Sequence, residues 1–81
     1  MAGGTLLLYS RPGCHLCEDM KALIEPVAQE LGWVIEERDI SSDASLEAEF
    51  GTEIPVLFVN GRKAFKYRVS THELRERLRR G

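Results

Sequence analysis

The chain has 81 residues and a formal net charge of −2 at pH 7, which predicts one domain spanning 1–81 with a modest core. The charge is uneven, because residues 1–60 carry three Lys and Arg against eleven Asp and Glu, whereas residues 61–81 carry eight against two. The acidic part opposes polyanions, and the basic residues are not interleaved with an aromatic platform on which bases could stack. We therefore expect no nucleic-acid partner.

The two cysteines, Cys14 and Cys17, belong to one C-x-x-C motif, so they cannot crosslink distant segments. The chain starts without a basic, apolar leader, and no apolar run approaches the roughly 18 residues of a membrane span. We expect a cytoplasmic protein with no membrane partner. In that reducing compartment a C-x-x-C motif indicates redox or metal chemistry more often than a structural bridge.

The first two predicted elements flank this motif. Residues 5–10 contain the continuous apolar run 6–9, which is typical of a strand buried on both faces. A helix is predicted over about 15–31, since its apolar residues recur at steps of three and four: Leu16, Met20, Leu23, Ile24, Val27 and Leu31. Pro26 predicts a kink or an early end of this helix, and Gly32 a C-terminal stop.

A second strand is predicted over 33–39, and its charged second half suits a sheet edge. The helical crossover between the two strands makes them parallel. Ser41, Ser42 and Asp43 can cap a short helix that carries Leu46 and Phe50 on one face and ends at Gly51, a set of residues that predicts a helix over about 44–50.

A third strand is predicted over 54–59, followed by the hairpin pair Asn60-Gly61 and an antiparallel fourth strand over about 62–68. Alternation places three apolar residues of this region on one face: Phe65, Tyr67 and Val69. Ser70 and Glu73 have the spacing of a capping box, which predicts a last helix with Leu74 and Leu78 facing inward.

The C-x-x-C motif falls where Pro12-Gly13 turns the chain from strand to helix, so Cys14 lies at the helix N-terminus. Unpaired N–H groups and the positive end of the helix dipole favour a thiolate there. Cys17 falls on the buried row of the helix, where burial disfavours the charged form. Cys14 is therefore predicted to attack a disulfide as a thiolate, and Cys17 to resolve the mixed disulfide.

Two nearby cations are candidates for favouring the thiolate further, Arg11 and His15. For His15, the other interpretation is a solvated side chain at the loop–helix junction.

Two further functions stay open. Two thiolates supply half of a four-ligand metal or iron–sulfur site, which His15, a thiol ligand or a second protomer could complete. The pair could also act as a non-catalytic redox sensor whose disulfide switches a partner surface.

The element order β-α-β-α-β-β-α resembles the thioredoxin fold, an α/β class with a four-stranded mixed sheet and helices on both faces. Residues 9–17, Tyr-Ser-Arg-Pro-Gly-Cys-His-Leu-Cys, resemble a glutaredoxin active site. The pair Ile54-Pro55 and the following hairpin extend the likeness, so the chain is identified as a glutaredoxin-like protein of the thioredoxin superfamily. It departs from dithiol glutaredoxins in the dipeptide His15-Leu16 and in the absence of a Gly-Gly pair near residues 66–71.

The resemblance implies a thiol–disulfide oxidoreductase with Cys14 as nucleophile and Cys17 as resolving thiol. It implies a cis-proline at Pro55, whose neighbour Ile54 presents backbone groups to an extended substrate, and a basic residue, Arg11, that meets a carboxylate of glutathione. We expect a monomer with no bound cofactor and no metal. Its expected partners are a disulfide-containing protein or a small thiol as substrate, and glutathione or a thioredoxin-reductase-type enzyme as reductant.

Overall fold

The computed structural model describes residues 3–80, and four strands form one sheet in the order β2-β1-β3-β4. Strand β2 runs parallel to β1, whereas β3 runs antiparallel to both β1 and β4. The predicted mixed sheet is therefore confirmed, and so is the edge position of the charged strand. The strand bounds are β1 Thr5–Ser10, β2 Val34–Asp39, β3 Val56–Val59 and β4 Arg62–Lys66.

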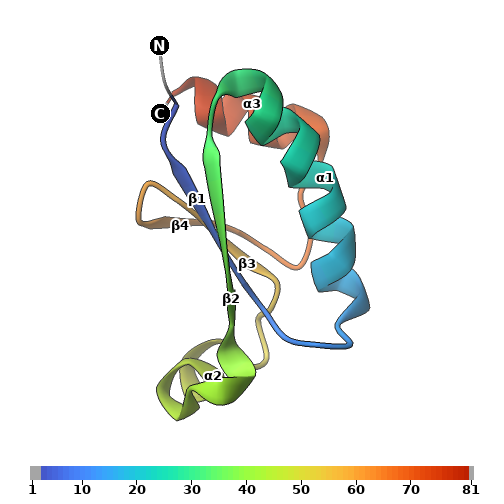
Figure 1. Ribbon diagram of the computed structural model, residues 1–81, viewed down its shortest axis with the longest axis vertical. Helices are drawn as coiled ribbons and strands as arrows, with labels where there is room; N and C mark the ends of the chain where they lie inside the picture. The colour runs from blue at the N-terminus through green and yellow to red at the C-terminus, as the bar shows by residue number, and fades with distance from the viewer. Residues whose placement is uncertain (1–2, 81) are drawn as a thin grey trace.

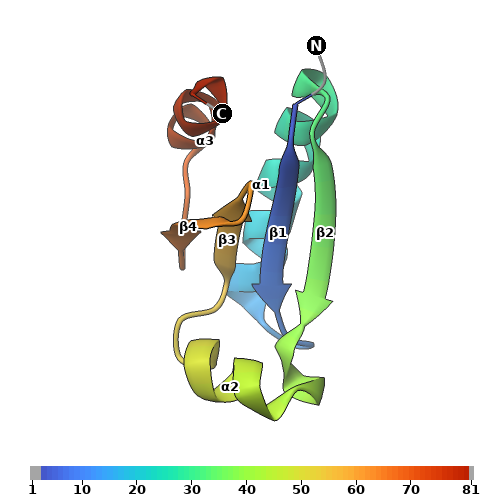
Figure 2. The same ribbon diagram turned by 90° about the vertical axis from the view of Figure 1, so that its left-hand side faces the viewer.

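Helices lie on both faces of the sheet, as predicted. Helices α1 and α3 pack against each other on one face, and α2 lies at the end of the molecule where β1 and β2 finish (Figures 1 and 2). A short 3₁₀ turn, η1, connects β2 to α2. The bounds are α1 His15–Leu31, η1 Ile40–Ser42, α2 Ala44–Phe50 and α3 Thr71–Arg79.

The alternation of side chains along β1 and β3 divides the core between the two faces. One cluster packs α1 and α3 onto the sheet: Leu6, Leu8, Met20, Ile24, Val27, Ala28, Leu57, Val59, Leu74 and Leu78. A smaller cluster holds α2 against the other face: Ile40, Phe50 and Val56, with Tyr9, Leu46, Ile54 and Phe58 packed on it. Both clusters reach the end of β1 that leads into the C-x-x-C motif.

Helix α1 continues through Pro26 to Leu31, so the predicted bounds are confirmed, and an early end at Pro26, one of the two alternatives, is wrong. Pro26 and Ala22, whose carbonyl loses its hydrogen-bond donor, are both exposed, so water can bond that carbonyl instead. Val27 and Ala28 are buried directly after the proline and hold the helix on the sheet. Gly32 then caps the helix at φ 76°, as predicted.

Strand β4 ends at Lys66, two residues earlier than predicted. Tyr67 has φ 68°, in the left-handed region, which takes the chain out of the extended conformation. The predicted alternation also fails earlier in the strand, because Leu57 pairs with Phe65 and Phe58 with Lys63, which leaves Ala64 as a bulge. Because the strand ends at Lys66 and Tyr67 is left-handed, Phe65 and Tyr67 do not share one continuous strand face.

The remaining local signals behave as the sequence indicates. Asn60 and Gly61 have φ values of 50° and 83°, as a two-residue hairpin with positive φ at both positions requires. Asp43 caps α2 by accepting from two backbone N–H groups, and Ser70 and Glu73 form the capping box of α3. No helix within residues 3–80 combines the length and the apolarity needed to cross a membrane.

Candidate active site

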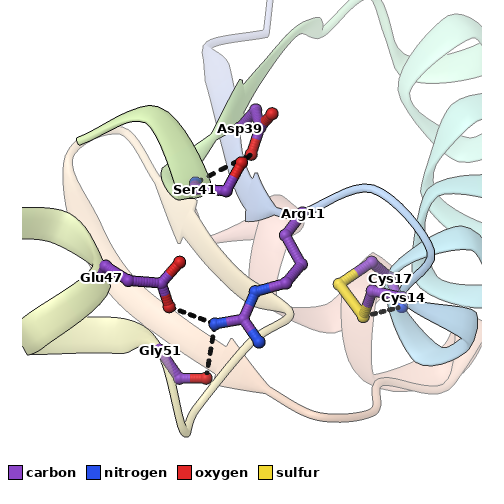
Figure 3. Close-up of polar contacts among 7 residues, drawn as sticks. All are labelled: Arg11, Cys14, Cys17, Asp39, Ser41, Glu47 and Gly51. Carbon is purple, nitrogen blue, oxygen red and sulfur yellow. Dashed lines mark hydrogen bonds and ion pairs between the residues drawn. A yellow bond between two sulfur atoms is a disulfide. The ribbon is translucent and has the colours of Figure 1, made fainter. Parts of the chain in front are cut away.

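Cys14 and Cys17 form a disulfide at the N-terminus of α1, with their Cα atoms 5.2 Å apart (Figure 3). Cys14 is the N-cap residue, with extended backbone angles. Its Sγ accepts a hydrogen bond of 3.1 Å from the backbone N–H of Cys17. The sulfur of Cys14 therefore occupies the position where an N-cap oxygen usually satisfies an unpaired helix N–H.

The two cysteines differ in exposure. Cys17 keeps 3% of its surface exposed and lies on the buried side of α1 with Met20, whereas Cys14 is partly exposed. The geometry thus gives one sulfur that a partner can reach and one that the core shields. This asymmetry is what a two-step exchange reaction requires.

Arg11 lies three residues before Cys14, and its guanidinium points away from the disulfide, toward α2 (Figure 3). Its Nη2 donates to the carboxylate of Glu47 and, at 3.1 Å, to the backbone carbonyl of Gly51. Arg11 thus ties the redox loop to the end of α2. A substrate carboxylate at Arg11 would share the guanidinium with Glu47, so the substrate-binding role of Arg11 stays a prediction.

A glycine is required at position 51, because the guanidinium of Arg11 approaches its backbone closely. A Cβ atom at Gly51 would collide with the backbone carbonyl and side chain of Glu47 and would come within 3.3 Å of Nη2 of Arg11. The absence of a side chain therefore lets the guanidinium reach the carbonyl of Gly51.

Asp39 ends β2 beside this network. It accepts hydrogen bonds of 2.7 and 2.8 Å from the hydroxyl and the backbone N–H of Ser41 (Figure 3). These bonds, with a smaller contribution from the charge of Arg11, hold the pKa of Asp39 below its usual value. The negatively charged Asp39 and the positively charged Arg11 thus line the same hollow beside the redox loop.

A polar cluster shares a hollow of about 390 Å³ with the buried Cys17. In this cluster Glu37 of β2 accepts from the hydroxyl of Ser10 and from Nζ of Lys21, each at 3.0 Å. The bond from Lys21 lowers the pKa of Glu37, and the same bond raises the pKa of Lys21. An ion pair and a water-accessible hollow therefore adjoin the shielded sulfur.

His15, the first residue of α1, extends into solvent with 87% of its side chain exposed. Its Nε2 lies 3.7 Å from a carboxylate oxygen of Asp19, one turn further along the helix. Whether His15 favours the thiolate of Cys14 stays a prediction.

Ile54 and Pro55 precede β3, at the end of the sheet where β1 leads into the redox loop, since Val56 pairs with Tyr9. The Ile54–Pro55 peptide bond is cis. Pro55 is buried, and its carbonyl accepts the backbone N–H of Tyr67 at 2.8 Å. The fold thus brings Pro55 to the sheet end that carries Cys14, and contact of either residue with a substrate stays a prediction.

Within the described residues, no group of three or more His, Cys, Asp or Glu side chains is arranged to hold a metal ion.

Sequence reasoning missed the residues that surround the motif. The partners of Arg11 come from α2 and from the residue that follows it, and the partner of Lys21 comes from β2. Glu47 and Glu37 are two of the eleven acidic residues in positions 1–60. The structure pairs Leu8 with Glu37, and this register does not follow from the parallel orientation of the two strands, so no sequence signal indicated Glu37.

Several known proteins resemble this chain along most of its length. An uncharacterized protein of Mycobacterium tuberculosis is 33% identical over 73 residues, covering 84% of this chain and 75% of that protein. The X-ray structure of a protein from X. campestris has a TM-score of 0.75 at 32% identity, covering 94% of this chain and 97% of its own. The solution structure of a protein from Nitrosomonas europaea has a TM-score of 0.80 at 28% identity, covering 96% and 94%.

More distant structures share the fold alone, among them a thioredoxin from Halobacterium salinarum with a TM-score of 0.64 at 18% identity, covering 94% of this chain and 72% of that one. The family described as glutaredoxin-like domain (DUF836) matches residues 5–79. The chain therefore belongs to this glutaredoxin-like family and has the thioredoxin fold.

Proposed function

We propose that this protein is a dithiol–disulfide oxidoreductase. The observation that carries the proposal is the pairing of a partly exposed sulfur at a helix N-cap with a buried sulfur one turn further in, at Cys14 and Cys17. Membership of the glutaredoxin-like family supports a redox role for the pair.

In the reduced protein, the thiolate of Cys14 attacks one sulfur of a substrate disulfide. A mixed disulfide forms, and the other substrate sulfur leaves as a thiolate that takes a proton from solvent. The N–H of Cys17, which already bonds Sγ of Cys14, favours the attacking thiolate.

Cys17 then loses its proton and attacks the sulfur of Cys14. The Cys14–Cys17 disulfide forms, and the second substrate thiol is released. The hollow that Cys17 shares with Glu37 gives this proton a path to solvent. Two electrons and two protons have then passed to the substrate, and two molecules of a thiol such as glutathione restore the dithiol and leave as their disulfide.

Single substitutions test the two roles. Cys14→Ser should abolish the reduction of a small disulfide, because the remaining thiol, Cys17, is buried. Cys17→Ser should keep the first step and accumulate a mixed disulfide between substrate and Cys14, which intact mass spectrometry detects. Full activity of Cys14→Ser would overturn the proposal.

A redox titration in glutathione buffers supplies the second test. A working exchange catalyst should show a midpoint between about −150 and −280 mV, the range that includes thioredoxin, glutaredoxins and protein disulfide isomerase. A pair that stays oxidised below about −300 mV, with no glutathione adduct on Cys14, would instead indicate an inert bridge and would refute catalysis.

A further inference from the structure

Tyr67 combines an unfavourable backbone conformation with an exposed aromatic ring. Its φ of 68° lies in the left-handed region, which residues with a Cβ rarely adopt. Its surface is 43% exposed, and it is one of two exposed large hydrophobic residues within 3–80, the other being Val34. Burial of the ring therefore does not compensate for the unfavourable backbone.

Hydrogen bonds hold Tyr67 at both ends. Its backbone N–H donates to the carbonyl of Pro55 at 2.8 Å, and its hydroxyl donates to the carbonyl of Thr52 at 3.0 Å. Nζ of Lys66 lies 5.5 Å from the centre of its ring. The exposed ring is therefore fixed in one position before any partner arrives. Unfavourable conformations that the surroundings enforce in this way occur preferentially at binding and catalytic sites.

Tyr67 also lines a groove that includes a residue of the redox motif, Leu16. Tyr67 and Val69 line one side, and Leu16, Met20 and Leu23 of α1 line the other. Leu16 stands between the two cysteines in the sequence, so the groove begins at the redox motif. Leu16 lies two residues from Cys14, so we expect the residues next to a substrate cysteine bonded to Cys14 to reach the groove.

The size and charge of the groove select its occupant. Its volume is about 210 Å³, below the roughly 300–1,000 Å³ of pockets that enclose whole small molecules. Asp19 and Arg68 supply one charge of each sign to the lining, so the groove offers no net charge to an anion such as glutathione. An apolar side chain would instead be removed from water against Leu16, Val69 and the ring of Tyr67.

We propose that this groove receives an apolar side chain next to the reactive cysteine of a protein substrate, and that Tyr67 sets this preference. The inference rests on the proposed function. Because Tyr67 is already fixed, binding does not have to immobilise it, and more of the burial free energy appears as affinity for the apolar side chain.

The test compares two peptides that carry the same intramolecular disulfide and differ only in Leu or Ser beside the attacked cysteine. The wild-type protein should reduce the Leu peptide with a kcat/KM about tenfold higher, which is the scale of discrimination in a small apolar pocket. Tyr67→Ala should bring the ratio close to one. Tyr67→Phe, which keeps the ring but loses the bond to Thr52, should retain most of the preference.

Val34→Ala is the matched control, because it removes the other exposed apolar side chain from the edge strand β2. It should leave the ratio unchanged. If Tyr67→Ala does not fold, as judged by circular dichroism, Leu16→Ser removes the opposite wall and should lower the ratio equally.

Reduction of 2-hydroxyethyl disulfide by the wild-type protein separates the possible failures. If this small disulfide is reduced but both peptides react at equal rates, or if Tyr67→Ala keeps the tenfold ratio, the groove proposal is wrong and the oxidoreductase stands. If neither the small disulfide nor either peptide is reduced, the proposed function fails, and the groove proposal fails with it.

Discussion

Ser10, Glu37 and Lys21 connect the end of β1, the edge strand β2 and helix α1 at the hollow beside Cys17. Glu37 accepts two hydrogen bonds and adjoins the positive charge of Lys21, so folding stabilises its ionised form. The side chain of Glu37 is 37% exposed, and solvent screens this pair substantially. A cluster of this kind makes a modest contribution to stability that depends on pH.

Glu37→Gln should lower the stability of the protein at pH 7 but not in acid. The pKa of Glu37 is lowered by folding, so its contribution is present above the unfolded value of 4.5 and is lost as pH falls through the folded value. The pKa of Lys21 is raised, so its contribution is lost only as pH rises through its own folded value. Urea unfolding at pH 7 and pH 3 measures the effect as a shift of the midpoint.

Glu36→Gln is the control for this prediction, because Glu36 pairs with Arg38 two residues away on the same exposed strand. It should shift the midpoint little at either pH. A deficit of Glu37→Gln that is as large at pH 3 as at pH 7 would contradict the electrostatic explanation.

The burial of individual residues could be predicted where helical or strand periodicity determines which side chains face the core. The burial of Cys17 follows from its helical spacing to Met20 and Ile24, and the structure confirms it. The guanidinium of Arg11 was not predictable, because its partner lies 36 residues away on another helix. Tyr67 was predicted to continue a strand, since left-handed φ is expected at Gly or Asn and its compensating bonds come from distant carbonyls.

Helix α3 depends on its N-terminal cap for its position on the sheet. The hydroxyl of Ser70 accepts the N–H of Glu73, and the carboxylate of Glu73 accepts the N–H of Ser70, both at 3.0 Å. Leu74 and Leu78 on the following turns are buried in the main core. Fraying of the first turn would therefore disturb the core as well as the helix end.

Ser70→Ala should lower the free energy of unfolding by about 1 kcal/mol, the usual cost of losing an N-cap side chain. In a domain of this size the loss corresponds to a fall in Tm of about 4–8 °C, which differential scanning calorimetry measures. Ser45→Ala is the matched control, because Ser45 is exposed inside α2, where alanine is favoured. An equal fall for both variants would show that the cap has no specific role.

At the scale of elements, the sequence predicted which helices and strands form but not all their ends. Caps carried by side chains close in sequence, such as Asp43 and Ser70, placed the starts of α2 and α3 correctly. The ends that were misplaced belong to strands: β3 begins at Val56, two residues later than predicted, and β4 ends at Lys66, where Tyr67 bonds Pro55.

The whole molecule holds its redox loop on a scaffold that does not depend on the crosslink. The main core is built from β1, β3, α1 and α3, and it is closed by contacts between residues far apart in the chain. The disulfide spans a sequence separation of 3, so it restricts the unfolded chain little. The order of elements therefore predicted the fold correctly without any knowledge of the oxidation state.

Reduction of the Cys14–Cys17 disulfide should leave the protein folded, and it should lower the free energy of unfolding by less than about 2 kcal/mol, the value expected for closing so short a loop. Ile24→Ala, which opens a cavity under α1, should cost more, about 2–5 kcal/mol. Urea unfolding of the wild-type protein with and without excess phosphine, followed by circular dichroism, measures the first value, and the oxidised variant supplies the second. An exchange catalyst passes through both states in every cycle, so a reduced protein that unfolds in the absence of urea would contradict both this prediction and the proposed function.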